Sequence, residues 1–347
     1  MNMPPTPNLP LMDSFATSEP AYRDRSTGLT VFGVIQIAAG GLCALMVPLA
    51  LFGFVMSKKV SGVSAPIGSQ MIAIGEYLAA AVLLIVLGIG STQAKRWAYT
   101  LTLILSSVWL IGGTLVTIMI TAILPVIMKT AMHQTPNGNQ LPAAFMAIFL
   151  TIAIAFLAFF LIVLPIIFLA FYRKKDVWET CRHRDPIERW TERAPLPVLA
   201  ASLFLFASGC MSFLSIMAAR LFPFFGTYLV AIPAAIALVS VAVIDFYLAR
   251  AFYRVQLAGW YIALIVKGLL VLSAAITTFR NDLMSAYVKL GMSSEQLRMM
   301  NSSPITHSKA IMWFGLSYSL IFLGYLIWLK KYFNNSNASQ PAILASE

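Results

Sequence analysis

The sequence predicts an all-α membrane protein, a polytopic helix bundle of about eight transmembrane helices arranged as two tandem four-helix repeats in parallel orientation. Charged residues make up only 11% of the 347 residues and hydrophobic residues 59%, whereas an ordinary globular protein is about 25% charged. The apolar residues also occur in blocks of about 20 or more, long enough to cross a hydrocarbon layer of about 30 Å as a helix. In addition, segments of the second half resemble segments of the first.

Apolar windows bounded by proline, glycine and charged residues mark the expected spans. These windows run over residues 29–56, 72–92, 99–125, 143–171, 198–219, 227–250, 257–279 and 309–329. Pro48, Pro165 and Pro233 lie inside spans. Because proline removes a backbone donor, we expect each of them to kink its helix.

Polar segments flank and divide these spans. We expect a disordered cytoplasmic tail, a first four-helix repeat, a charged cytoplasmic loop with short interfacial helices, a second four-helix repeat and a second cytoplasmic tail, at residues 1–28, 29–171, 172–197, 198–331 and 332–347 respectively. The first tail is rich in Pro, Ser and Thr, and it lacks the basic start and apolar run of a signal peptide.

The net charge of +11 is explained by membrane topology. The basic residues sit at the ends of apolar segments instead of forming one long patch, so we expect no nucleic-acid partner. With eight spans, most Lys and Arg residues fall on the same side of the membrane as the N-terminus. The positive-inside rule therefore predicts that both termini are cytoplasmic.

The two halves resemble one another in the positions of individual residues as well as in hydropathy. The segment "IAAGGLCALMVPLALFG" (37–53) resembles "FASGCMSFLSIMAARLF" (206–222), and "KRWAYTLTLIL" (95–105) resembles "AGWYIALIVKG" (258–268). Four spans per half bring both halves into the membrane in the same direction, which predicts parallel repeats. The alternative is that apolar helices resemble one another through composition alone.

Three ionisable residues, Glu76, Asp245 and Lys267, lie well inside predicted spans, where a charge is a functional hypothesis by default. Asp245 lies about 7 Å and Lys267 about 15 Å from the inner ends of adjacent spans, so we expect them to pair. The alternatives are an ion pair that only fixes helix packing, or snorkelling. Glu76 is close enough to the outer end to reach headgroups or to bind a proton. Alignment of Trp97 with Trp260 leaves these charges unduplicated.

The central loop is dense in charge. Asp185 and Pro186 suit the N-cap and first turn of a helix, so we expect two short helices at the inner membrane face. The expected contacts with anionic lipid headgroups, or with a protein partner, are Trp178, Arg182, Arg184, Arg189, Trp190 and Arg193.

The stretch "VWETCRHRDPIERWTERAPLPVL" (177–199) resembles uncharacterised bacterial multi-pass membrane proteins that have no assigned activity. The resemblance covers this stretch alone. It implies a bacterial inner-membrane setting, and it implies no reaction, substrate or ligand.

Familiar catalytic patterns are missing from the sequence. His133, His183 and His307 fall in separate loops on opposite sides, and no phosphate-binding glycine loop or nucleophile elbow is present. Cys181 and Asp185 flank His183, but neighbours in sequence rarely point at one another. We therefore expect no catalytic site, no metal and no cofactor.

These observations order three classes of function. The first is a non-catalytic membrane module or accessory subunit with a partner- or lipid-contacting cytoplasmic loop. The second is a small-molecule or ion transporter or channel that uses the intramembrane charges, and it requires a cavity between the halves. A membrane enzyme comes third, because only the central loop offers a cluster of reactive side chains.

Overall fold

The computed structural model describes residues 22–61, 67–133, 143–218, 221–280 and 309–333, with a few single residues between 281 and 308. Eight helices in these ranges are long and apolar enough to cross a membrane. The predicted all-α polytopic bundle is therefore confirmed. The expected tails fall largely outside the described residues.

The first half holds four helical segments, the last of them interrupted. They are α1 (Ser26–Ser61), α2 (Ile67–Thr92), α3 (Arg96–His133), and α4 (Ala143–Ala158) joined through the π-helical turn η1 (Phe159–Val163) to α5 (Leu164–Tyr172). The second half holds α7 (Leu196–Ala218), α8 (Ala231–Tyr253), α9 (Leu257–Arg280) and α12 (Lys309–Trp328), with helical structure resuming up to Phe333. Between the halves lie α6 (Lys175–Arg184) and the 3₁₀ turn η2 (Trp190–Glu192).

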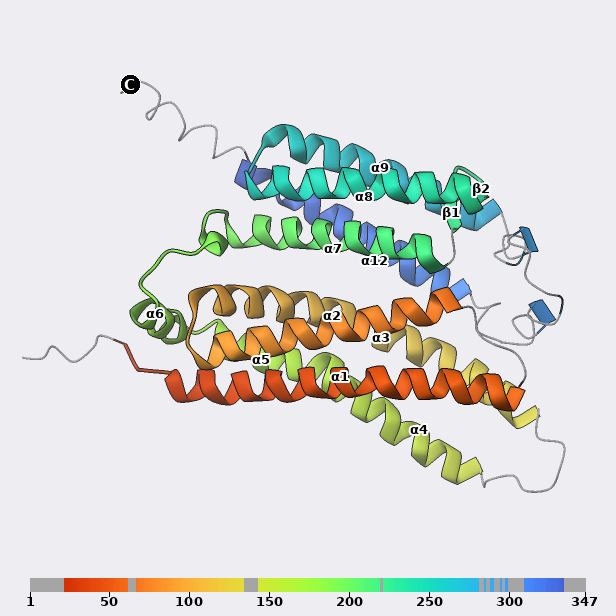
Figure 1. Cartoon of the computed structure of the whole chain (residues 1–347), viewed down its shortest axis with the longest axis horizontal. Helices are drawn as coiled ribbons and strands as arrows, with labels where there is room; N and C mark the ends of the chain where they lie inside the picture. The colour runs from red at the N-terminus through yellow and green to blue at the C-terminus, as the bar shows by residue number, and fades with distance from the viewer. Residues whose placement is uncertain are drawn as a thin grey trace, which may run out of the picture.

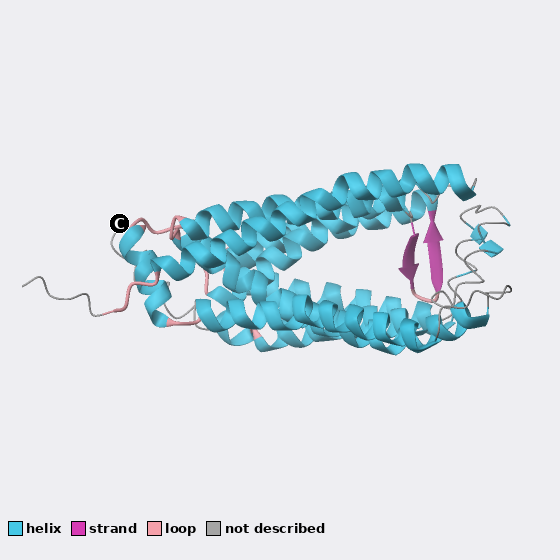
Figure 2. Cartoon of the chain, turned by 90° about the horizontal axis from the view of Figure 1, so that it is seen from below, coloured by secondary structure: helices cyan, strands magenta, loops and turns pink. Residues whose placement is uncertain are grey.

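The two halves lie side by side in one bundle, with the helices roughly along its long axis (Figure 1). Residues 175–193 form a cap at one end, where α1 begins and α12 ends. A β-hairpin, β1 (Leu221–Phe224) and β2 (Thr227–Val230), lies at the other. We call these the cap end and the hairpin end. Figure 2 shows the ribbons of the two halves closer together toward the cap end than toward the hairpin end.

Small residues let the first two helices of each half approach closely. A Cβ on Gly33 would lie 2.7 Å from the carbonyl oxygen of Gly88, and a Cβ on Gly40 would lie 2.7 Å from Ile85. In the second half, Ser202 Oγ donates to the carbonyl of Ala249 at 2.7 Å. The helices α1 and α2 therefore pack backbone to backbone, whereas α7 and α8 are joined through a serine side chain that bonds to backbone.

These contacts recur at corresponding positions of the two halves. Gly209 packs against Phe246 as Gly40 packs against Ile85. Equivalent positions in the first helix of each half are 169 residues apart: 33 and 202, and 40 and 209. Equivalent positions in the second helix and the turn after it are 161 residues apart: 85 and 246, 88 and 249, 90 and 251, and 94 and 255. The change of spacing falls between the first two helices of each half: α1 and α2 are longer than α7 and α8, which are joined through the β-hairpin.

The turn after the second helix fixes this register. Ala94 has φ 51° and Val255 has φ 53°. One residue later, Lys95 donates to the carbonyl of Gly90 at 2.9 Å, and Gln256 donates to the carbonyl of Ala251 at 3.0 Å. Residue for residue, these are the same turn.

The turn also sets how tightly the following helix packs. A Cβ on Gly90 would lie 2.6 Å from Ala98 Cβ, and a Cβ on Gly259 would lie 2.6 Å from Ala251 Cβ. This register places Tyr99, and not Trp97, opposite Trp260, which corrects the alignment expected from the sequence.

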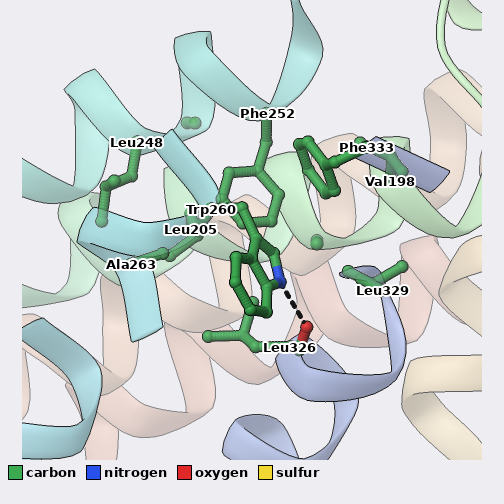
Figure 3. Packing of buried hydrophobic residues seen from close by; sticks show 11 residues of the cluster. Val198, Leu205, Leu248, Phe252, Trp260, Ala263, Leu326, Leu329 and Phe333 are labelled. Carbon is green, nitrogen blue, oxygen red and sulfur yellow. Dashed lines mark hydrogen bonds between the residues drawn. The ribbon is translucent and has the colours of Figure 1, made fainter. Parts of the chain in front are cut away.

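The cores of the halves correspond in the same register. Tyr172 and Phe333 are both fully buried near the cap end. Tyr172 makes a hydrogen bond with Ser91, whereas the Phe333 ring meets Phe252 edge-on, with centroids 5.1 Å apart. Figure 3 shows this second core, in which Trp260 Nε1 donates to the carbonyl of Leu326. A polar contact in one half is thus replaced by an aromatic contact in the other.

Pro165 is associated with a break in the last helix of the first half, as the sequence predicts. It lies at the start of α5, directly after the π-helical turn. Because proline has no N–H, it cannot bond to the carbonyl of Leu161, four residues earlier. That carbonyl lies against Gly113 of α3, where a Cβ would overlap the oxygen. Gly113 therefore lets α3 approach an exposed backbone group.

The β-hairpin corrects one boundary. The sequence predicts a span from residue 227, but residues 227–230 form β2, and α8 begins at Ala231. Pro233 consequently lies in the first turn of α8, where it does not interrupt a preceding helix, and the expected kink there is wrong. The turn residues Phe225 and Gly226 have φ of 37° and 95°, as a two-residue hairpin turn requires. Their N–H groups donate to Ser273 and Thr277 of α9.

We predict that Gly113→Ala destabilises the bundle by about 1–3 kcal/mol, because the methyl group would overlap the Leu161 carbonyl. Gly112→Ala is the matched control, since a Cβ there meets nothing within 4 Å. Thermal unfolding in detergent should show a lower midpoint for Gly113→Ala alone. Equal midpoints for the two variants would contradict this packing.

Candidate functional site

The cap folds back onto the first half through an amphipathic helix. Val177, Thr180 and Cys181 are the buried residues of α6, and Val177 and Cys181 are fully inaccessible. They join a cluster that includes Leu29 and Tyr172 near the cap end of the bundle. An acidic residue in the first turn and basic residues in the last turn suit the dipole of α6. The loop is thus a docked element of the fold.

Asp185 links the cap to the start of α3. It is the C-cap of α6, where its N–H donates to the carbonyl of Cys181 at 2.9 Å. The expected N-cap of a second loop helix is therefore wrong, because residues 186–189 are not helical. Its carboxylate instead accepts hydrogen bonds from the N–H of Arg96 at 3.3 Å and from the guanidinium of Arg189 at 2.7 and 3.1 Å.

Because of these hydrogen bonds, the contribution of Asp185 to the stability of the docked cap depends on pH. The hydrogen bonds from Arg189 hold the pKa of the Asp185 carboxyl below its ordinary value of 3.8. A depressed folded-state pKa means that the carboxylate stabilises the docked cap above that value. This contribution is lost as the pH falls through the folded-state pKa, in the range below 3.8.

Arg96 is the buried charge around which the cap is built. It is only 6% exposed. Its guanidinium forms an ion pair with Glu192 and donates to the carbonyl of Pro186 at 3.3 Å. It also lies 5.2 Å from the ring centre of Trp178. A buried cation is tolerated only when it is paired in this way. In the sequence Arg96 is one of the basic residues at the ends of apolar segments, and no local signal predicted this role.

The segment before α1 holds the other side of the cap. Arg25 pairs with Asp176 at 3.5 Å, and its N–H donates to Thr180 at 3.0 Å. Arg184 pairs with Asp24 at 3.4 Å. The N-terminal segment and the central loop are therefore tied together, although about 150 residues separate them in sequence.

The loop residues predicted to contact lipid or a partner divide into two groups. Trp178 packs on Tyr99, with ring centres 5.2 Å apart, while Arg184 and Arg189 form ion pairs within the chain. The exposed group, for which no ion pair occurs among the described residues, is Arg182 and Arg193, together with Trp190, which is 45% exposed. Arg182, Arg193 and Trp190 are therefore accessible to a lipid or a protein partner.

Trp190 also joins the two halves. Its carbonyl accepts a hydrogen bond from the Tyr253 hydroxyl of α8 at 3.1 Å. Because Glu192 of the same turn pairs with Arg96 of α3, η2 connects the first half to the second at the cap end.

The reactive side chains of the loop are not arranged for catalysis. Burial raises the pKa of the Cys181 thiol to about 12, so the thiol is protonated at neutral pH and is a poor nucleophile. His183 is exposed and stacks on Tyr22. Among the residues that the structure describes, no three His, Cys, Asp or Glu side chains converge to hold a metal ion.

Asp245 and Lys267 pair within the second half, as the sequence predicts. Lys267 Nζ lies 2.6 Å from Oδ1 and 2.8 Å from Oδ2 of Asp245, and Ser208 Oγ donates to Oδ2 at 2.7 Å. Asp245 is fully buried and the Lys267 side chain is 12% exposed. The corrected register places Leu84 and Ser106 at the equivalent positions of the first half, so the pair belongs to the second half alone.

Glu76 is not brought to either site. It lies on an exposed face of α2. No hydrogen-bond or ion-pair partner for it occurs among the described residues. The structure thus supplies it with no partner for a proton relay.

An apolar cavity of about 540 Å³ lies between the halves. Its walls come from α3 and α5 of the first half and from α7 and α12 of the second. Asp245, Lys267 and Glu76 do not line it; the one charged lining residue is Arg173, at the cap end of α5.

Comparison with protein-family models, with curated proteins and with solved structures finds no match for this chain. The resemblance of residues 177–199 to bacterial multi-pass membrane proteins stays a prediction. The function is therefore inferred from the cap and the cavity.

We predict that Asp185→Asn loosens the cap and exposes the Cys181 thiol. In a chain carrying Cys43→Ser and Cys210→Ser, a maleimide should modify Cys181 slowly when Asp185 is present and faster in the variant, because the link to α3 is weakened. Glu188→Gln is the matched control, since Glu188 is exposed and carries the same charge. Equal labelling rates in the two variants would contradict the proposed role of Asp185.

We predict that Asp245→Leu or Lys267→Ser alone lowers stability by about 3–5 kcal/mol, because each leaves a buried charge unpaired. The double substitution installs the residues of the first half and should recover most of the loss. Detergent unfolding of the three variants measures this. A double variant no more stable than the singles would argue against the pair as an exchangeable packing element.

Proposed function

We propose that this protein is a non-catalytic integral membrane module whose cap contacts anionic lipid headgroups at the cytoplasmic face. The observation that carries the proposal is the division of charge in the cap. Buried charges pair within the chain, whereas Arg182 and Arg193 remain exposed, as do Ile187, which is 64% exposed, and Trp190. Cationic and aromatic side chains together suit the headgroup region.

The proposed orientation follows from the placement of basic residues. The cap end carries Arg173, Lys174, Lys175, Lys330 and Lys331, all of them exposed. The positive-inside rule places this end in the cytoplasm. We propose the bacterial inner membrane as the setting, supported by the resemblance of residues 177–199.

A transporter is the second candidate, and the cavity between the halves favours it. The intramembrane charges do not support an ion pathway, because Asp245 and Lys267 satisfy one another and Ser208 outside the cavity. A transported molecule would have to be largely apolar to suit the lining.

We also propose that the halves are a tandem repeat. Matching glycine contacts, matching turns at Ala94 and Val255, and matching buried positions at Tyr172 and Phe333 support it. Similar composition alone does not explain a shared register of contacts. Recovery of stability in the double variant of Asp245 and Lys267 tests this equivalence, because it exchanges residues between the halves.

We predict that vesicles containing phosphatidylglycerol raise the thermal midpoint of the protein relative to phosphatidylcholine alone, and that Arg182→Gln with Arg193→Gln removes part of this rise. Each basic residue near an anionic surface contributes about 1 kcal/mol. Unlike Arg184 and Arg189, these two residues hold no ion pair of the cap, so the fold should be kept.

Arg280→Gln at the hairpin end removes one positive charge away from the cap, and it is the control for Arg182→Gln and Arg193→Gln made singly. An unchanged lipid response in the double variant would reject the headgroup contact. Retention of a stoichiometric protein by the wild-type chain but not by the double variant, without a lipid effect, would identify a protein partner instead. Labelling of Glu188→Cys by an impermeant reagent in intact cells would overturn the orientation.

A further inference from the structure

The cavity between the halves has the depth of one membrane leaflet. On α3 its lining runs from Leu103 to Ile111, and on α12 from Tyr318 to Trp328. At about 1.5 Å per helical residue these stretches are about 12 and 15 Å long, close to half of a hydrocarbon core of about 30 Å. The cavity extends from the cap end toward the middle of the bundle.

The walls of the cavity are suited to hydrocarbon. The rings of Phe204 and Phe322 are tilted against one another, with centroids 4.3 Å apart, and form an aromatic surface on the second half. Two hydroxyls of the lining already have backbone partners, because Ser107 donates to the carbonyl of Leu103 and Tyr325 to that of Pro197, both at 2.8 Å. An occupant is therefore offered apolar contact along most of its length.

The cavity is not enclosed, because lining residues from both halves are about half exposed. Ile111 is 49% exposed, Ile321 45% and Trp328 48%. These residues belong to spans on opposite sides of the cavity, so the opening lies between the halves and within the membrane. A lipid chain can enter from the side without crossing water.

The cap end of the cavity is cationic. Arg173 lines it and is exposed. Lys331 lies 4.0 Å from the ring centre of Trp328, which also lines it. A positive charge at the headgroup end of an apolar cavity is complementary to an anionic amphiphile.

We propose that this cavity binds an acyl chain of one anionic phospholipid from the cap-side leaflet, with Arg173 against its phosphate. The proposal rests on the orientation proposed above, in which the cap end faces the cytoplasm. A volume of about 540 Å³ lies within the range of ligand pockets. The bound lipid touches both halves and so adds to the protein contacts between them.

The test is native mass spectrometry of the delipidated full chain, titrated with phosphatidylglycerol or phosphatidylcholine of identical chains. Wild type should retain one phosphatidylglycerol more tightly than phosphatidylcholine. Ala200→Phe fills the cavity from α7 and should weaken retention of both lipids by about tenfold or more. Arg173→Gln should reduce the preference for phosphatidylglycerol by about fivefold while chain binding persists.

Ala44→Phe is the matched control, because Ala44 is exposed on α1 and does not line the cavity. Unfolding midpoints of both phenylalanine variants check that the fold is kept. Equal retention by wild type and by a folded Ala200→Phe would overturn the cavity as the site. An unchanged preference in Arg173→Gln would overturn the phosphate contact.

The two proposals fail separately. Arg182→Gln with Arg193→Gln alters the exposed surface of the cap and leaves the cavity lining untouched. If that variant keeps its tightly held lipid while Ala200→Phe loses it, the cavity stands whatever the cap surface does. If the cap variant loses the lipid and Ala200→Phe keeps it, the cavity proposal is wrong and the cap contact is supported.

Discussion

The constraint on which this structure depends is that hydrocarbon offers no hydrogen-bond partner to the backbone. Irregular backbone accordingly occurs where the protein supplies a partner. Ser273 and Thr277 accept the N–H groups of the hairpin turn. At the cap end, the carboxylate of Asp185 accepts the first N–H of α3. The hairpin is therefore held by side chains of α9, and the cap by the bond of its own Asp185 to the backbone of α3.

The same features show how far the sequence could be read. Span positions depend on composition alone, and the pairing of Asp245 with Lys267 follows from the helical rise, so both could be predicted. The hairpin could not, because its residues are as apolar as a span and its turn depends on hydroxyls some 50 residues away. Asp185 has the local signature of an N-cap, but its carboxylate bonds to residue 96, which local signals do not contain.

The dense charge of the central loop is largely a means of attachment. A polar segment that must cover the end of an apolar bundle cannot rely on hydrophobic contact alone, and Arg96 supplies a buried cation that, in the part of the chain the structure describes, this loop neutralises through Glu192. Glu192 lies in the same turn as Trp190, whose carbonyl accepts the hydrogen bond from Tyr253. The contacts that attach the loop to the first half therefore also align the second half with it. The residues of the loop that remain exposed, Arg182, Arg193 and Trp190, are the ones proposed to contact lipid headgroups.

The close contact after the second helix of each half bears on how repeated sequences diverge. It joins residues 90 and 98 in the first half and residues 251 and 259 in the second. One half places glycine before alanine and the other alanine before glycine, with the same approach of 2.6 Å for an added Cβ. What is held constant is the combined volume of two side chains, so either position can change when the other compensates. In two halves of common origin, residue identity would then decay while the geometry persisted. A common origin would be easier to detect in coupled pairs of positions than in single columns of an alignment.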